Sequence, residues 1–149
     1  MRNVIVWLDD EHFMLELYRE ALIENTHDKM VVMMSDVDKA WDYIRENRAD
    51  IYGVVLDIIM DPGALFADEE THYGRETGLF FFEKLREEVP ELPVAFLTCV
   101  TDLDMLFRVI DKPRVQVFKK IYDLPSEFAP HCAEFFRKCW RQLGKAVRA

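Results

Sequence analysis

The chain has 149 residues, of which 50% are hydrophobic and 13% aromatic, and its formal net charge at pH 7 is −9. This composition is typical of one globular domain with a sizeable core, and it excludes an intrinsically disordered chain. The negative charge disfavours nucleic acid and anionic membrane surfaces as direct partners. Because no segment approaches the roughly 20 apolar residues of a membrane span and no signal peptide is recognised, we expect a cytoplasmic protein with reduced cysteines.

Five short apolar runs, each free of charged residues, predict buried strands of a parallel β-sheet. They alternate with stretches whose apolar residues recur at helical spacing, so we expect five successive βα units with helices on both faces of the sheet. The predicted strands are Val4–Leu8, Met30–Met34, Ile51–Leu56, 93–97 and 115–118, and the predicted helices are 13–26, 37–44, 79–88, 102–110 and 125–147.

The connection after the third predicted strand is unlike the others. Residues 61–76 are polar and contain Pro62, Gly63, Gly74 and an acidic run at 68–70. A βα connection usually takes about 2–6 residues, and longer ones are usually functional. We therefore interpret residues 61–76 as an insertion beside the end of the third strand.

Polar residues follow four of the predicted strands. They are Asp9 and Asp10 after the first, Asp57 after the third, Thr98 after the fourth and Lys119 after the fifth. Because the carboxyl ends of parallel strands share one edge of the sheet, we expect these groups to converge on one crevice. Two carboxylates about 4 Å apart repel each other by about 4 kcal/mol at an effective dielectric constant of 20, so the crevice needs a cation.

Oxygen ligands alone favour a hard ion such as Mg²⁺, which prefers one or two carboxylates together with phosphate oxygens. With that ion in place, Asp57 could stay ionised and attack a phosphoryl group. A lysine and a hydroxyl, here Lys119 and Thr98, suit the oxygens of the transferred group.

Four motifs, at residues 8–11, 54–60, 93–98 and 117–119, resemble the receiver domain of two-component response regulators. The resemblance covers nearly the whole chain and implies a bacterial, stand-alone receiver domain spanning residues 1–149. It implies an α/β, flavodoxin-like (βα)5 three-layer sandwich with a parallel five-stranded sheet in the order 2-1-3-4-5. It also implies a phosphoprotein that receives its phosphoryl group in a His-Asp phosphorelay and is not an enzyme beyond its own phosphorylation and dephosphorylation.

The resemblance also implies a role for each strand-end residue. Asp57 resembles the phosphoacceptor, and Asp10 and Asp57 resemble direct Mg²⁺ ligands. The backbone carbonyl of Ile59 resembles a third ligand, and Asp9 resembles a residue that acts on the metal through water. Thr98 resembles the switch hydroxyl and Lys119 the phosphate-binding lysine.

Two positions depart from the family pattern and keep alternatives open. Gln116 stands three residues before Lys119, where an aromatic switch residue is usual, and Lys120 stands where a proline is usual. They favour a second hypothesis, a pseudo-receiver that binds partners without phosphorylation. A one-residue shift of the strand register would put Lys120 in the place of Lys119. A third hypothesis is a Mg²⁺-dependent phosphohydrolase that also uses an aspartate nucleophile. The sequence disfavours it, because Ile59 stands where that chemistry requires a second acid as general acid.

The implied partners are a histidine kinase or a phosphotransfer protein and an unknown downstream protein. The resemblance also suggests a homodimer through helix 102–110, strand 115–118 and the last helix. We expect His12 to face solvent rather than to bind a metal. On the last helix, Phe136 and Trp140 belong to an apolar stripe that we interpret chiefly as core, with an exposed edge for a partner as the alternative.

Overall fold

The computed structural model describes residues 1–11 and 15–148. Five parallel strands form one sheet in the order β2-β1-β3-β4-β5, which confirms the predicted flavodoxin-like fold class. The strands β1 and β3, which precede the predicted acids Asp9 and Asp57, are neighbours in the sheet. The strands are β1 (Val4–Leu8), β2 (Met30–Met34), β3 (Ile51–Leu56), β4 (Val94–Thr98) and β5 (Val115–Lys119).

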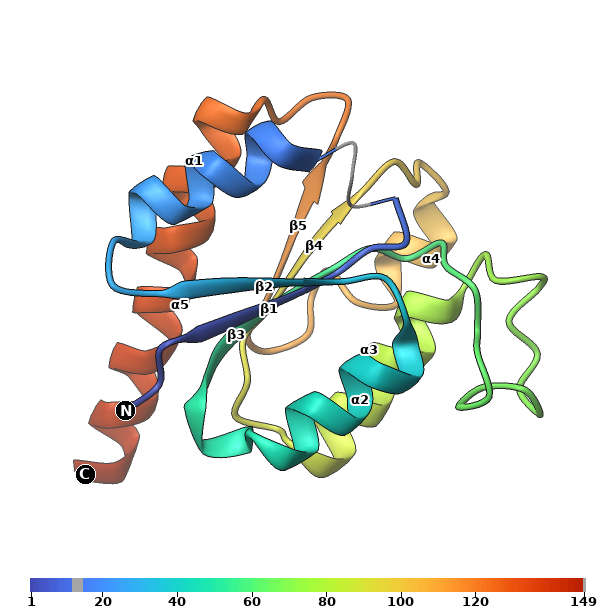
Figure 1. Ribbon diagram of the computed structural model, residues 1–149, viewed down its shortest axis with the longest axis horizontal. Helices are drawn as coiled ribbons and strands as arrows, with labels where there is room; N and C mark the ends of the chain where they lie inside the picture. The colour runs from blue at the N-terminus through green and yellow to red at the C-terminus, as the bar shows by residue number, and fades with distance from the viewer. Residues whose placement is uncertain (12–14, 149) are drawn as a thin grey trace.

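Helices cover both faces of the sheet (Figure 1). α1 and α5 pack on one face, and α2, α3 and α4 pack on the other, so that the described residues form three layers with one apolar cluster on each side. The helices are α1 (Glu16–Thr26), α2 (Val37–Glu46), α3 (Thr77–Glu88), α4 (Leu103–Phe107) and α5 (Pro125–Arg148), with a short 3-10 turn η2 (Arg48–Asp50) before β3.

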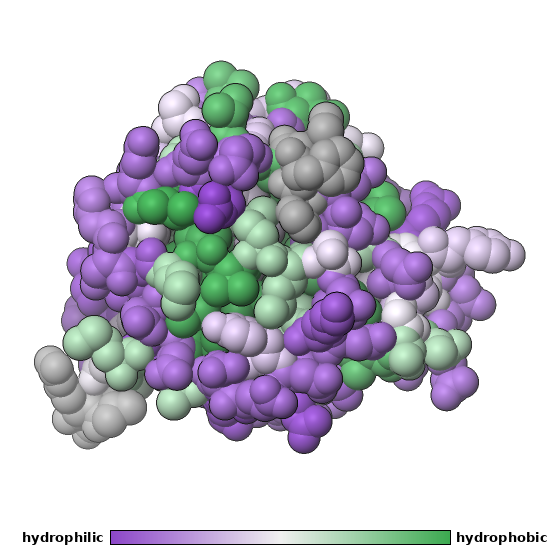
Figure 2. Space-filling view, viewed as in Figure 1, coloured by the Kyte–Doolittle hydropathy of each residue, from purple (hydrophilic) through white to green (hydrophobic). Residues whose placement is uncertain are grey.

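The burial of the strands follows from this layering. Every residue of β1 and β4 is buried, because both faces of the central sheet are covered by helices and no solvent face remains. The edge strand β2 is different: Met30 is exposed and three of its other four residues are only half-buried. In the space-filling view, an apolar area surrounded by hydrophilic side chains lies in the middle of the face where β2 runs (Figure 2).

The helix bounds differ from those expected from the sequence; α2 and α5, for example, end one or two residues later than expected. α3 begins at Thr77, two residues early, and α4 ends at Phe107 rather than at residue 110. α4 is short because the N–H of Arg108 already bonds to the carbonyl of Met105, three residues back, and turns follow. α1 begins at Glu16, and the predicted helix start at residue 13 lies outside the described residues, as does His12.

The apolar stripe of α5 is mainly core. Phe136 is fully buried, and its ring lies 2.6 Å from where a Cβ on Gly53 would stand, so β3 and α5 approach closely only because residue 53 is glycine. Trp140 is half-buried at the edge of that core. Within the part of the chain that the structure describes, no helix combines the length and apolarity needed to cross a bilayer.

Candidate functional site at the carboxyl ends of the strands

Two carboxylates meet where the central strands end. Asp9 follows β1 and Asp57 follows β3. The N–H of Asp57 donates to the carbonyl of Leu8 (3.1 Å) and that of Asp9 to the carbonyl of Met34 (3.0 Å), so both residues extend the hydrogen bonding of the sheet. Asp9 is fully buried and Asp57 is 8% exposed. The sheet therefore holds two acids close together at a position that is largely shielded from solvent.

The cation between them is Lys120. Its ammonium Nζ lies 2.8 Å from Oδ2 of Asp9 and 3.1 Å from Oδ2 of Asp57, and its side chain is 15% exposed. The prediction that the side chain of Lys119 lies beside the acids is therefore wrong. Its Nζ lies 6.0 Å from the ring centroid of Tyr122 instead. The alternative register, in which Lys120 takes this position, is the one that the chain adopts.

The physical reason is the alternation of side chains along a strand. Lys119 pairs with Thr98 as the last residue of β5, and the next residue turns to the opposite side of the sheet. The N–H of Lys120 bonds to the carbonyl of Thr98 (3.0 Å), and its own carbonyl accepts from the hydroxyl of Tyr18 (3.1 Å). These backbone contacts fix Lys120 beside the acids. In the sequence, the position of Lys120 two residues after the apolar Phe118 supports the alternative register named above.

The electrostatics of this cluster are unbalanced. Burial raises the pKa of Asp57 above its usual range, and the neighbouring charge of Asp9 raises it further, while Lys120 and Thr98 act in the opposite direction. Burial lowers the pKa of Lys120, but the two carboxylates more than compensate and raise it overall. Burial also raises the pKa of Asp10. One ammonium thus pairs with two carboxylates, and a third, Asp10, is close enough to Asp57 for its pKa to be raised by that charge, which leaves the cluster short of positive charge.

The other predicted residues surround this pair. Thr98 ends β4, is fully buried, and accepts a hydrogen bond from the N–H of Val100 (3.2 Å). Asp10 is exposed at the mouth of the crevice, and Ile59 presents an exposed side chain two residues after Asp57. The structure therefore brings all the predicted site residues to the carboxyl ends of the strands, but the side chain of Lys120, rather than that of Lys119, reaches the acids.

The donor atoms at this edge suit a hard cation. The side chains of Asp10 and Asp57 and the backbone of Ile59 offer only oxygen ligands, and the shortage of positive charge leaves room for a divalent ion. In the described ranges 1–11 and 15–148, no group of three or more His, Cys, Asp or Glu side chains is gathered closely enough to hold a metal by itself. A metal here would need ligands beyond the side chains, such as a carbonyl, water or a phosphate oxygen.

The end of the insertion packs directly on the backbone after Asp57. The N–H of Gly78 donates to the carbonyl of Ile58 (2.8 Å), and the hydroxyl of Thr77 donates to the carbonyl of Met60 (2.6 Å). A Cβ on Gly78 would stand 2.0 Å from the carbonyl oxygen of Asp57. Only glycine fits at residue 78, and α3 therefore begins in contact with the segment that carries Asp57.

Two further contacts, which sequence reasoning missed, attach the insertion to its neighbours. The carboxylate of Asp38, at the start of α2, accepts from the N–H groups of Ala64 and Leu65 (3.0 and 2.7 Å). Glu76 forms an ion pair with Arg108, which follows α4. The partners are 26 to 32 residues apart in the sequence, so no local pattern predicts these contacts. Residues 61–76 thus link the segment after Asp57 to both α2 and the end of α4.

Comparisons with known proteins bear on the fold. No protein-family model matches the sequence, and no curated protein is similar to it in sequence. Solved structures are similar in three dimensions. A response regulator receiver protein from Sinorhizobium medicae has a TM-score of 0.68 and 18% identity, over 93% of this chain and 97% of that one. A response regulator receiver domain protein from Clostridium thermocellum has a TM-score of 0.71 and 16% identity, over 97% and 98%.

A third similar structure is the phosphorylated cyanobacterial phytochrome response regulator RcpA. It has a TM-score of 0.66 and 18% identity, over 91% of this chain and 94% of that one. Identities this low establish the fold and leave the chemistry to be argued from the site. The chain therefore has the fold of a response regulator receiver domain.

Proposed function

We propose that the protein is the phosphoacceptor of a two-component signalling system and is phosphorylated on Asp57. The observation that carries the proposal is the cluster of Asp9, Asp57 and Lys120, in which a buried acid at a strand end is only partly neutralised. Buried acids that share one cation and keep a raised pKa are typical of sites that bind a charged ligand. A transferred phosphoryl group together with a divalent cation fits this requirement.

In the proposed reaction, a carboxylate oxygen of Asp57 attacks the phosphorus of a phosphohistidine on a kinase or phosphotransfer protein. The new bond is O–P, the N–P bond breaks, and the histidine nitrogen takes up a proton. Lys120 and Thr98 lie beside Asp57 and are the groups that would bind the oxygens of the transferred phosphoryl. Asp57 must be ionised to attack, so a bound cation that lowers its raised pKa would favour the reaction.

Mg²⁺ is the cation that we propose, held by Asp10, Asp57 and the carbonyl of Ile59. When bound, it would neutralise charge on the acids and on the phosphoryl oxygens. Asp9 has a separate role in this proposal: its Oδ1 accepts from the N–H of Glu11 (2.8 Å) and its Oδ2 binds Lys120. It would therefore orient the lysine and act on the metal through water.

Thermal unfolding with a phosphate mimic tests this function. Beryllofluoride with Mg²⁺ should raise the Tm of the wild-type protein, because a ligand that binds only the folded state stabilises it. Asp57→Asn should abolish that rise, whereas Asp61→Asn, an exposed neighbour, should leave it in place. An equal rise in the wild type and in Asp57→Asn would refute phosphoacceptance at Asp57.

The output of the proposed switch would be a changed protein contact. α4 and the turns after it expose Leu103, Phe107 and Ile110, the second of them to 61%. Because exposed apolar side chains of this size favour burial, this surface is where we propose that a downstream protein or a second copy of the chain binds. The chain would then act on its own phosphoryl group only and would not be an enzyme for other substrates.

A pseudo-receiver remains the second candidate, and one observation favours it. With Lys120 at the site, the residue three positions earlier is Val117, so neither lysine has an aromatic residue at that distance. Lys120 also supplies an internal cation that holds Asp9 and Asp57 together. Phosphate-affinity electrophoresis after treatment with acetyl phosphate separates the two: a shifted band supports phosphoacceptance, and its absence supports the pseudo-receiver.

A further inference from the structure

The C-terminal part of α5 has a charge opposite to that of the chain. Residues 135–149 contain five of the chain's 19 lysines and arginines and none of its 28 acidic residues. In Figure 1 the last turns of α5 run past the amino ends of the strands, at the opposite end of the sheet from the end of β3, which Asp57 follows. A basic segment on an acidic protein creates a local field that attracts anions.

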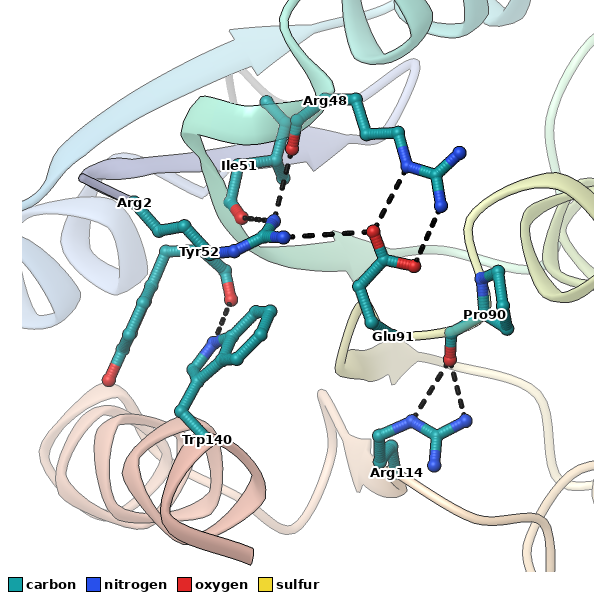
Figure 3. Close-up of polar contacts among 8 residues, drawn as sticks. All are labelled: Arg2, Arg48, Ile51, Tyr52, Pro90, Glu91, Arg114 and Trp140. Carbon is teal, nitrogen blue, oxygen red and sulfur yellow. Dashed lines mark hydrogen bonds and ion pairs between the residues drawn. The ribbon is translucent and has the colours of Figure 1, made fainter. Parts of the chain in front are cut away.

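This basic segment borders a groove of about 580 Å³. Two stacked aromatic rings form its floor: those of Tyr52 and Trp140, with centroids 6.4 Å apart. The indole N–H of Trp140 donates to the carbonyl of Tyr52 (2.7 Å), and the guanidinium of Arg2 lies 4.4 Å from the Trp140 ring (Figure 3). These contacts fix the orientation of the Trp140 ring. The groove is lined by Tyr52, Arg137, Trp140, Arg141, Gly144 and Lys145, with no acid among them.

The cations of the groove form a regular row. Arg137, Arg141 and Lys145 are four residues apart along α5, which spaces them by about 6 Å along the helix axis. Alternate side chains of an extended peptide are about 6.6 Å apart, nearly the same distance. Glu134 pairs with Arg137 and Arg141 at 2.8 Å each, which orients both guanidinium groups and offsets one of their two charges, and Arg141 stays 63% exposed. The row therefore matches acids at alternate positions of an extended chain.

Gly144 supplies an independent indication of a ligand. A Cβ built on it meets no atom of residues 1–11 or 15–148 within 4 Å, so this part of the fold does not require glycine there. Glycine inside a helix is less stable than alanine. Close approach of a ligand to the helix backbone is one of the few reasons to keep a glycine at such a position.

We propose that this groove, at Tyr52, Trp140 and Gly144 with the row Arg137, Arg141 and Lys145, binds an extended acidic segment of a protein partner. Its backbone would run along α5 and pass close to Gly144, and its alternate acidic side chains would pair with the row. The overall charge of −9 repels large polyanions such as nucleic acid or an anionic membrane, whereas a short acidic peptide meets mainly the local basic field.

Fluorescence anisotropy of a fluorescein-labelled peptide, with aspartate at alternate positions over about nine residues, tests the proposal. The wild-type protein should bind it at low salt and should bind the same peptide with asparagine much more weakly. Gly144→Leu should reduce the affinity at least about tenfold, because its side chain fills open space in the groove without removing charge. The double variant Arg141→Gln/Lys145→Gln should reduce it similarly.

The matched control is Lys39→Gln/Arg45→Gln, which removes two exposed cations from α2 and should leave the affinity unchanged. Asp57→Asn should also bind normally, so a failure of the proposed phosphorylation leaves this result intact. Full affinity of Gly144→Leu, equal binding of the asparagine peptide, or preferential binding of duplex DNA or of phosphatidylserine vesicles would each overturn the proposal.

Discussion

The two ends of the sheet shift the pKa of a carboxylate in opposite directions. At the amino ends of the strands, Glu91 accepts two hydrogen bonds from Arg48 (3.0 and 3.1 Å) and lies 3.7 Å from Arg2 (Figure 3). Burial raises the pKa of Glu91, but these guanidinium groups together lower it below its usual range. At the carboxyl ends, burial and Asp9 raise the pKa of Asp57 in spite of Lys120.

This difference separates structural from functional charge. Glu91 is stabilised as an anion by partners that the fold itself provides, so it needs nothing further. Asp57 is destabilised as an anion, and Lys120 and Thr98 correct that destabilisation only in part. Natural proteins keep such local conflict chiefly where a ligand relieves it. The comparison therefore supports a ligand at Asp57 and none at Glu91.

The largest expected effect comes from removing the cation at the carboxyl ends. Lys120→Met leaves the buried Asp9 and the nearly buried Asp57 without their common partner, and breaking a buried pair in this way costs about 3–5 kcal/mol. Lys119→Met, one residue earlier, should change the free energy of unfolding by less than about 0.5 kcal/mol. Urea unfolding of the two variants measures the difference, and equal losses would contradict the assignment of Lys120.

A pair of glycine substitutions compares the backbone at the two ends. Gly78→Ala forces a Cβ against the carbonyl oxygen of Asp57 and should destabilise the protein by about 1–3 kcal/mol or more. Gly144→Ala meets open space in a helix and should stabilise it by up to about 1 kcal/mol. Opposite shifts in Tm are expected in differential scanning calorimetry, and shifts of the same sign would show that one of the two environments is misjudged.

The smallest effect is a pH dependence of opposite sign at the two acids. Since folding raises the pKa of Asp57, its ionisation disfavours the folded state, and the penalty grows as the pH rises from the unfolded pKa through the folded one. In the absence of divalent ions, Asp57→Asn should therefore raise the Tm at pH 7, by about 2–4 °C for each kcal/mol relieved.

Glu91 has the reverse sign. Since folding lowers its pKa, its ionised form contributes stability above the unfolded pKa, and that contribution is lost as the pH falls through the folded pKa. Glu91→Gln should lower the free energy of unfolding at pH 7 by less than about 1 kcal/mol and should lower the Tm accordingly. The difference from wild type should shrink in acid. Melting curves from pH 3 to pH 7 check both signs. A higher Tm for the wild type than for Asp57→Asn at pH 7 would contradict the opposite signs expected for Asp57 and Glu91.

Much of the fold was predictable because it depends on local patterns. The runs Val4–Leu8 and Met30–Met34 coincide with β1 and β2, and the alternation of strands and helices required a parallel sheet. Asp9, Asp57 and Thr98 were predictable for the same reason, since each directly ends or follows a strand whose carboxyl end must lie at one edge.

The amino-acid sequence by itself determined the sheet, its burial and the edge at which the acids gather, because periodicity and strand ends are properties of consecutive residues. Only the tertiary structure decided which of two adjacent lysines reaches the acids, because one residue of register reverses the direction of a side chain. It also decided the pairing of Glu91 with Arg48 and the groove beside Trp140, whose members are 43 and 88 residues apart. Contacts across such separations depend on packing, and no local pattern encodes them.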